Sequence, residues 1–373
     1  MTSAPTSPDA DHRSLLADSV RAFTGREANV ARTRRWRGLP EEYDRAAWRQ
    51  MGTLGWLGVL VSEQYGGSGL GLSEAAIVAD GLARSLAPEP YTATAVLAAR
   101  ALLAADNETL KKELLPQLVS GTLIPALAWQ ERPGELDCNV IEAVANPFEG
   151  GYRLNAVKRF IAGAAGADGF LVTARVGPDA ALFWVPRDAP GADCKLEALA
   201  DGRHFGALVL NDVVVPREHA AGSAAGVASA LNDALVVIGA ELSGVMSRAL
   251  DMSLDYLKSR VQFGKPIGAF QALQHRAVDV YLQRELASAV LDEALCIFDG
   301  GADAPTRARW ASRVKARCSD AAAKITRECI QFHGAIGFTD EFDAGLYLKR
   351  ALVLSAWLGS AAYHRRRYAS LTP

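Results

Sequence analysis

The spacing of apolar residues changes twice along this chain, and each change restricts the fold. From Ser14 to about Leu118, apolar residues recur mostly at intervals of three and four, the pattern of amphipathic helices. From about Gly121 to Pro216 they come in short runs separated by Gly, Pro, Asn and Asp, which is typical of strands and turns. After Pro216 the helical spacing returns in long segments rich in Ala and Leu. The order is therefore helical, β, helical.

We expect a multidomain α+β protein on this basis. Its predicted parts are an N-terminal helical domain over residues 1–120, a middle β domain over residues 121–220 and a C-terminal helical bundle over residues 221–373. The long segments after residue 223 are apolar on more than one face, as helices are when they are buried in a bundle or at a subunit interface. An oligomer is therefore expected.

Composition excludes several classes of protein. Half of the 373 residues are hydrophobic and the formal net charge is −2, which argues against disorder and against a basic nucleic-acid surface. The five cysteines are scattered and lack the short paired spacing of metal sites, so we expect reduced thiols and no metal. Residues 1–13 lack a signal-peptide pattern, and no apolar run reaches the ~18 residues of a membrane helix. A cytoplasmic protein with no membrane partner is the expectation.

A glycine-rich segment over residues 55–71 interrupts the first helical region. Glycine alternation suggests either phosphate binding or a structural loop. No strand, loop and helix with G-x-G-x-x-G spacing frames it, which favours the structural loop.

Two segments of the C-terminal half resemble motifs of the acyl-CoA dehydrogenase family. The first runs from Arg260 through Phe263-Gly264 to Phe270-Gln271, and the second runs from Gln331 to Thr339. Tyr65-Gly66-Gly67 and Val213-Val214-Val215-Pro216 agree with them. The resemblance covers nearly the whole chain and implies the acyl-CoA dehydrogenase-like order of helical domain, β domain and helical bundle.

The resemblance implies FAD as cofactor. In that family the two motifs bind the flavin of a neighbouring subunit, which assigns the diphosphate and adenine half to Arg260, Phe263, Gln271, Gln331 and Gly334. A planar guanidinium offers paired donors to phosphate oxygens, and glycine lets backbone amides come close. The alternative for Arg260 is a surface ion pair at a helix end.

The family's catalytic carboxylate has no clear counterpart. Family members remove the α-proton of an acyl-CoA thioester with a carboxylate while the flavin accepts the β-hydrogen as hydride. The usual glutamate lies in a Tyr-Glu-Gly-Thr-like turn, and the matching turn here is Trp357-Leu358-Gly359-Ser360. Leu358 cannot take a proton. The family's other known position falls at about Ala234, beside Asp233.

Glu241 is the other candidate base, because it interrupts the apolar stretch over residues 234–240. Burial raises the pKa of carboxylates in general, which suits a base. A hydrogen-bonded or ion-paired helix residue is the structural alternative. Asp233 is the second choice, one residue out of register.

The β domain departs from the family pattern as well. Where relatives place Thr-Glu-Pro-x-x-Gly-Ser-Asp, residues 130–137 begin with Gln130-Glu131, and where relatives place Trp-Ile-Thr the chain has Phe160-Ile161-Ala162. Two hydroxyl donors to the flavin ring are therefore missing. The parts lent to a neighbour are intact, whereas the chain's own ring-side parts are not.

The resemblance therefore predicts a partner-type subunit of an FAD-dependent acyl-CoA dehydrogenase. The assembly would be an α2β2 heterotetramer, like those that dehydrogenate steroid side-chain CoA thioesters in actinobacteria, and it would pass electrons to an electron-transfer acceptor protein. Two alternatives stay open. In the first, the chain would be a self-sufficient homotetrameric dehydrogenase that uses Glu241 or Asp233 as base. In the second, it would be a flavin-free scaffold of the same fold.

Overall fold

The computed structural model describes residues 8–26 and 30–372. By its contacts the chain divides into two compact units, each assembled from separate stretches of sequence. The helical unit comprises Met1–Arg35, Leu72–Ala87 and Val236–Pro373. The sheet unit comprises Trp36–Gly71 and Pro88–Leu235.

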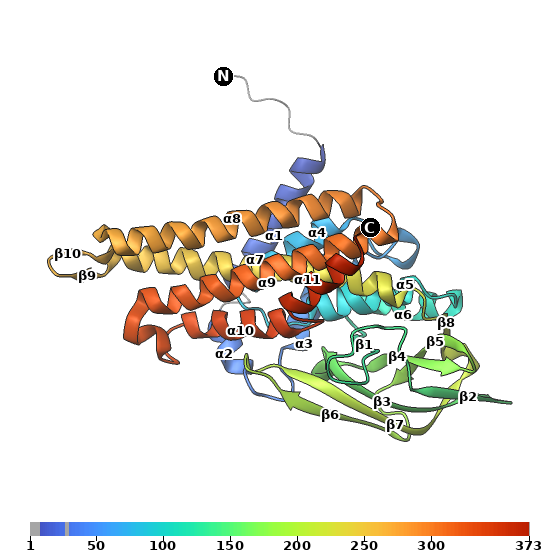
Figure 1. Ribbon diagram of the computed structural model, residues 1–373. Coiled ribbons are helices and arrows are strands. Elements are labelled where there is room, and N and C mark those ends of the chain that lie inside the picture. The colour runs from blue at the N-terminus through green and yellow to red at the C-terminus, as the bar shows by residue number, and fades with distance from the viewer. Residues whose placement is uncertain (1–7, 27–29, 373) are drawn as a thin grey trace. The chain divides into compact units, whose positions relative to one another are not determined.

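The helical unit is a bundle of long helices (Figure 1). Its main members are α7 (Val227–Ser259), α8 (Gln271–Asp299) and α9 (Ala304–His333), and α7 begins within the sheet unit. The others are α1 (Pro8–Arg26), α2 (Val30–Trp36), α4 (Leu72–Arg84), α10 (Ala344–Ala356) and α11 (Ala361–Ser370). Small residues let α7 approach its neighbours closely. A Cβ added to Gly244 would lie 2.3 Å from the Asp80 carbonyl oxygen of α4, and one added to Gly239 would lie 2.3 Å from a Val314 methyl of α9.

Helix α7 is apolar over most of its length. By length and composition it is the one helix of the described residues that could cross a membrane, yet 89% of its apolar window is buried inside the fold. Packing in the bundle therefore accounts for its composition, as for the core helix of a globular protein.

The first turn of α4 is capped from another helix. The Asp299 carboxylate, at the end of α8, accepts from the backbone N–H of Leu72 at 2.7 Å and of Ser73 at 3.2 Å, and from the Ser73 hydroxyl at 2.5 Å. Backbone N–H groups in a first helical turn have no partner within their own helix. Asp299 satisfies two of them and thereby fixes the start of α4 to the end of α8.

The sheet unit joins short helices to one mixed sheet. The helical elements are α3 (Arg45–Thr53), the π-helix η3 (Thr92–Ala98), α5 (Ala99–Leu103) and α6 (Glu108–Ser120). The glycine-rich segment forms the 3₁₀ turns η1 (Trp56–Gly58) and η2 (Glu63–Tyr65). Gly66 has φ +85°, and a Cβ on Gly67 would lie 2.0 Å from the Val61 carbonyl oxygen. These glycines are thus required by chain geometry.

In the described residues the sheet has eight strands in the order β6-β7-β3-β2-β4-β5-β8, with β1 paired parallel to β4. Their bounds are β1 Pro125–Ala128, β2 Val144–Phe148, β3 Gly151–Ala162, β4 Gly169–Val176, β5 Asp179–Pro186, β6 Ala192–Ala198, β7 His204–Pro216 and β8 Ala220–Ser223. The turns η4 (Ala164–Gly166) and η5 (Arg217–His219) follow β3 and β7. The buried side chains of Phe170, Val172, Phe183 and Leu208 belong to its core.

Strand β3 carries an irregularity at a position that matters for the site. Its antiparallel pairing with β7 shifts register between Lys158 and Ile161. Phe160 lies within this bulge with φ +56°, a left-handed conformation that is rare for a bulky residue. The bulge therefore redirects the side chains of the Phe160-Ile161-Ala162 segment.

The predicted order of elements is confirmed. Helices precede the sheet, strands occupy residues 125–223, and long helices follow. The expected boundaries at residues 120 and 220 stay a prediction, because the two compact units interleave in sequence.

Removing the cap of α4 should destabilise the fold without touching the candidate site. Asp299→Ala should lower the free energy of unfolding by about 1–2 kcal/mol, the usual effect of losing a capping side chain. Asp299→Asn keeps a capping oxygen and is the matched control. Urea denaturation followed by circular dichroism measures both, and equal stability of Asp299→Ala and the wild type would contradict this role.

Candidate functional site

The chain leaves α7 through a small hairpin at one end of the bundle (Figure 1). Strands β9 (Val261–Gln262) and β10 (Lys265–Pro266) pair antiparallel, with Gln262 opposite Lys265. The two residues between them, Phe263 and Gly264, have φ of +55° and +80°. Positive φ at both central positions defines a type I′ turn, which favours glycine at the second. The turn η6 (Ile267–Ala269) then leads into α8.

The hairpin presents Arg260 and Phe263 to solvent. The Arg260 backbone is tied down, since its carbonyl oxygen accepts from the Ile267 N–H at 2.8 Å. Its side chain is exposed, and among the described residues its guanidinium has no carboxylate within ion-pair distance. The Phe263 ring is 91% exposed and meets Phe270 edge-on, with ring centroids 6.2 Å apart. Lys265 Nζ lies 4.4 Å from the centre of the Phe270 ring.

The second predicted motif lies at the same end of the bundle. Arg276 in α8 pairs with Glu328 in α9 at 2.5 Å, which places the start of α8 beside the end of α9. Gln271 begins α8 and Gln331 lies in the last turn of α9, and both side chains are exposed. Gly334 ends α9 with φ +63° and ψ −136°, a conformation that is essentially restricted to glycine. It leads into the turn η7 (Gly334–Phe338).

These groups suit the diphosphate and adenine half of FAD. The guanidinium of Arg260 is exposed and without a carboxylate partner, and the first amides of α8 receive no side-chain cap. Both are donors for an anionic diphosphate. An exposed aromatic ring offers a flat apolar surface to adenine, and the glycine turn allows close approach. The residues present therefore fit this half of the cofactor.

His333, the last residue of α9, is packed directly before the Gly334 turn. It is buried, its Nδ1–H donates to the Cys329 carbonyl oxygen at 2.7 Å, and its ring centroid lies 4.5 Å from that of Tyr256 and 4.4 Å from that of Phe342. Burial lowers the pKa of His333, so the ring is neutral at physiological pH. Its contacts indicate a packing role.

The Trp357-Leu358-Gly359-Ser360 turn, which the sequence resemblance matched to the family's base turn, is well defined. Leu358 is buried with φ +56°, and Gly359 has φ +107°. The Leu358 carbonyl oxygen accepts from His364 Nε2 at 2.8 Å, and the Gly359 carbonyl oxygen accepts from Lys315 Nζ at 2.8 Å. The turn is thus held firmly, but the side chain at position 358 has no acid or base chemistry.

Both candidate carboxylates lie in ion pairs with arginine. Within the helical unit, Arg350 Nη2 donates to Glu241 Oε2 at 2.7 Å, and both side chains are nearly buried. Within the sheet unit, Arg100 Nε donates to the buried Asp233 carboxylate at 2.7 Å. These contacts give each carboxylate a structural function, because breaking a buried pair is strongly destabilising. A role for either residue as the base stays a prediction.

The segment that begins with Gln130-Glu131 keeps a scaffold contact. Glu131 Oε1 lies 2.5 Å from Lys158 Nζ, and the ammonium also donates to Thr173 Oγ1 at 2.9 Å. Burial lowers the pKa of Lys158 to about 8. Glu131 further accepts from the backbone N–H groups of Glu142 at 2.7 Å and Ala143 at 3.1 Å. The glutamate therefore pins the loop over residues 131–142 to the sheet.

The ring-side side chains themselves offer little to a flavin. Gln130 Nε2 donates to the carbonyl oxygen of Arg132 at 3.1 Å. Phe160 packs edge-on against Phe205, with centroids 6.4 Å apart, and Ala162 has no donor. This segment is held to the sheet by Glu131, whereas the two hydroxyl donors expected from the family pattern stay a predicted loss.

Sequence reasoning missed the π-helix η3. Its backbone shifts to i→i+5 bonding, a feature found frequently at functional sites. Thr94 in η3 is fully buried, and its Oγ1 finds no hydrogen-bond partner among the described residues. A Cβ on Gly163, directly after the Phe160-Ile161-Ala162 segment, would lie 3.6 Å from that oxygen. No side-chain pattern signals a π-helix, because the two helix types differ by less than one residue per turn.

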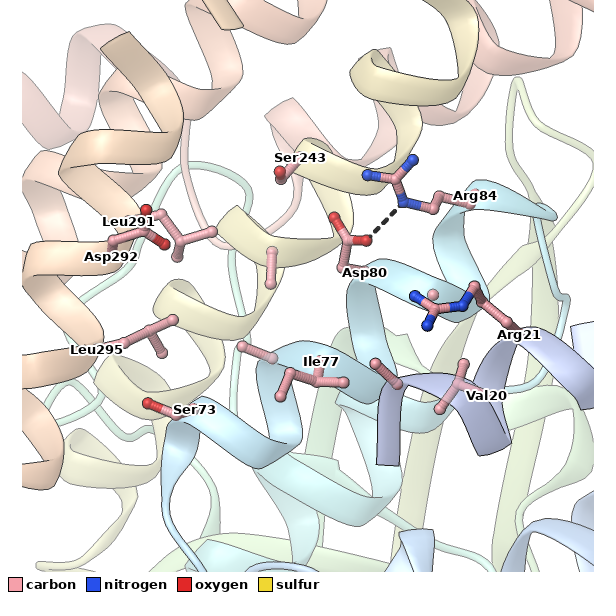
Figure 2. A pocket seen from close by; sticks show the side chains of 14 residues that line it. Val20, Arg21, Ser73, Ile77, Asp80, Arg84, Ser243, Leu291, Asp292 and Leu295 are labelled. Carbon is pink, nitrogen blue, oxygen red and sulfur yellow. Dashed lines mark hydrogen bonds and ion pairs between the residues drawn. The ribbon is translucent and has the colours of Figure 1, made fainter. Parts of the chain in front are cut away.

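A pocket of about 500 Å³ lies among α1, α4, α7 and α8 of the helical unit (Figure 2). Ile77, Leu291 and Leu295 line its apolar part. Asp80 and Arg84 also line the pocket, and they form an ion pair in which Arg84 Nε lies 2.7 Å from Asp80 Oδ2. The predicted flavin contacts and both candidate bases lie outside its lining.

Comparison with known proteins decides the family. Models of the acyl-CoA dehydrogenase N-terminal and C-terminal domains match residues 10–122 and 225–370. The acyl-CoA dehydrogenase IpdE2 of Mycobacterium tuberculosis is 30% identical over 345 residues, which cover 91% of each chain. The chain belongs to the acyl-CoA dehydrogenase family. Members of this family are FAD-dependent oxidoreductases.

Solved structures of heteromeric family members are also similar. The ChsE4-ChsE5 complex of Mycobacterium tuberculosis matches with a TM-score of 0.89 and 26% identity, covering 100% of both chains. A variant of the Tcur3481-Tcur3483 steroid ACAD matches with a TM-score of 0.87 and 28% identity, covering 97% of both chains. The acyl-CoA dehydrogenase fold predicted from the sequence is therefore confirmed.

Glu241→Gln separates the structural from the catalytic role of this carboxylate. If the contact with Arg350 is the main function of Glu241, the variant should lose about 3–5 kcal/mol of unfolding free energy, because the buried guanidinium of Arg350 loses the charge of Glu241. Thermal or urea denaturation measures the loss. Turnover that disappears while stability stays at the wild-type value would identify Glu241 as a base instead.

Proposed function

We propose that this chain is the flavin-lending, non-catalytic subunit of a heteromeric FAD-dependent acyl-CoA dehydrogenase. One contrast carries the proposal. The hairpin and the Gly334 turn are exposed and chemically intact, whereas the turn that should hold the base places Leu358 there. A chain with this combination can complete a neighbour's flavin site but has no acid or base at position 358 of its own site.

Each lent residue has a distinct task. Arg260 holds the diphosphate through its planar pair of donors, and Phe263 covers the adenine. Gln271 and Gln331 offer amide donors beside it, and Gly334 lets the backbone close over the dinucleotide. Bound FAD would supply a hydride acceptor for the β-hydrogen of the acyl-CoA. The α-proton must then be taken by a carboxylate of the partner subunit.

The similar heteromeric structures support the partner and the substrate class. ChsE4-ChsE5 is a complex of two different chains, and Tcur3481-Tcur3483 is described as a steroid ACAD. We therefore propose a homologous acyl-CoA dehydrogenase chain as partner in an α2β2 assembly, a CoA thioester with a bulky, steroid-like acyl group as substrate, and an electron-transfer protein as acceptor.

Expression with and without the partner tests the assembly. Alone, the chain should be poorly flavinated and inactive; co-expressed with its partner, it should yield an active complex with one flavin per two unlike chains. Flavin absorbance against peptide absorbance measures the ratio. A fully flavinated, active homo-oligomer would favour the self-sufficient alternative, and a native complex free of flavin would favour the scaffold.

Arg260→Ala tests the lent contact. Losing a charge-assisted bond to phosphate removes on the order of 1.5–3 kcal/mol, or ~10- to 100-fold in flavin affinity of the complex. Arg260→Lys should rescue only in part, because lysine keeps the charge but not the planar fork. Arg365→Ala, which removes an exposed arginine of α11 that is paired with Asp320 of α9, is the control. Unchanged flavin retention in Arg260→Ala, with the oligomer intact, would reject the contact.

A further inference from the structure

Lys315 is a buried cation whose three hydrogen-bond acceptors are all uncharged. It lies in α9 with no exposed surface, and its Nζ donates to the carbonyl oxygens of Ser355 at 2.9 Å and Gly359 at 2.8 Å. The Ser319 hydroxyl is a third partner at 3.4 Å. Within the described part of the chain, no carboxylate comes within ion-pair distance of it. Such a group is rare, because buried lysines are normally paired with an acid.

The two carbonyls flank the turn that stands where relatives carry their base. Ser355 lies in the last turn of α10, and Gly359 directly precedes the N-cap of α11. Trp357 and Leu358 lie between these anchors. An ammonium group has three N–H donors, which matches the three acceptors, whereas a neutral amine has two. Loss of one proton therefore removes a donor and turns the charge-assisted bonds to the carbonyls into weaker neutral ones.

The other titratable groups of this cluster keep one charge state near neutral pH. Cys318 follows Lys315 by three residues in α9. It is fully buried, and burial raises the pKa of its thiol to about 12. His364, which faces the cluster from α11, is buried too, and burial lowers its pKa to about 3. Arg367 of α11, bonded to the Ser312 hydroxyl at 2.8 Å, remains a cation. Burial lowers the pKa of Lys315 to about 7, so Lys315 is the member that changes charge in this range.

We propose that Lys315 is a proton-operated clamp on the Trp357–Ser360 turn, closed when its amine is charged and loosened when the amine is neutral. The clamp belongs to the helical unit alone and does not rest on the proposed function. It would make the conformation at position 358, in the turn that family members use for catalysis, depend on pH.

A rise in pH is expected to loosen the turn and, at the same time, to raise the stability of the whole fold. The folded-state pKa of Lys315 lies below its ordinary value of 10.5, so between about pH 7 and 10 the unfolded chain binds more protons than the folded one. Stability of the fold must therefore rise with pH through this window. The turn loosens around pH 7, at the lower end of this window. Global and local stability thus move in opposite directions, which ordinary alkaline unfolding does not produce.

Trp357 is a reporter inside the turn. The fluorescence difference between the wild type and Trp357→Phe, followed from pH 5.5 to 9.5, should show a one-proton transition with its midpoint near pH 7. Lys315→Met should abolish the transition. Lys315→Arg should keep the turn in its acid form throughout, since arginine stays charged. His364→Asn should leave the midpoint in place, and the exposed Lys258→Met serves as the lysine control.

Hydrogen exchange of the wild-type protein keeps the proposal testable if a variant fails to fold. Amides of residues 356–360, corrected for intrinsic pH dependence, should lose protection about fivefold between pH 6 and 8.5, as expected for one weakened hydrogen bond. Over the same interval the global unfolding constant should fall by up to about tenfold per pH unit. A Trp357 signal that is flat, a transition that survives in Lys315→Met, or unchanged protection of the turn would overturn the clamp.

Discussion

Buried polar contacts to α10 are the constraint on which the candidate active-site turn depends. The middle of this helix is tied to α7 by the pair of Arg350 and Glu241, and its end is tied to α9 by Lys315. The Tyr347 hydroxyl adds a 2.7 Å bond to the Arg84 carbonyl oxygen of α4. Each buried group would be costly if left unpaired. Together they hold α10 in one position and so place the turn that follows it.

The same logic explains how a site can lose its chemistry and keep its shape. Glu131 and Lys158 are paired in the sheet unit, and removing either one would leave a buried charge without its opposite charge. The two hydroxyls expected from the family pattern would carry no such penalty, since a donor that faces only a cofactor can be lost without harm to the fold. Erosion of a ring-side site is thus expected to spare the scaffold and remove the donors.

The two candidate bases show where inference from a sequence is limited. Glu241 was conspicuous because a carboxylate interrupted an apolar stretch, and that observation correctly predicted burial. Its partner Arg350 lies more than a hundred residues away, as Arg100 does from Asp233. No local pattern links such pairs, so the sequence favoured an ion-paired or hydrogen-bonded residue but left the base open. Only folded contacts show that an arginine already meets each carboxylate.

The sequence by itself determined the order of helices and strands and the uncharged side chain of Leu358 in the Trp357–Ser360 turn. These properties follow from side-chain periodicity and residue identity, which are both local. The tertiary structure decided the exposure of Arg260, the partners of Glu241 and Asp233, the π-helix and the isolation of Lys315 among neutral acceptors. These depend on groups that are distant in sequence and on the loss of water around them, because burial sets both the pKa of a charge and its need for a partner.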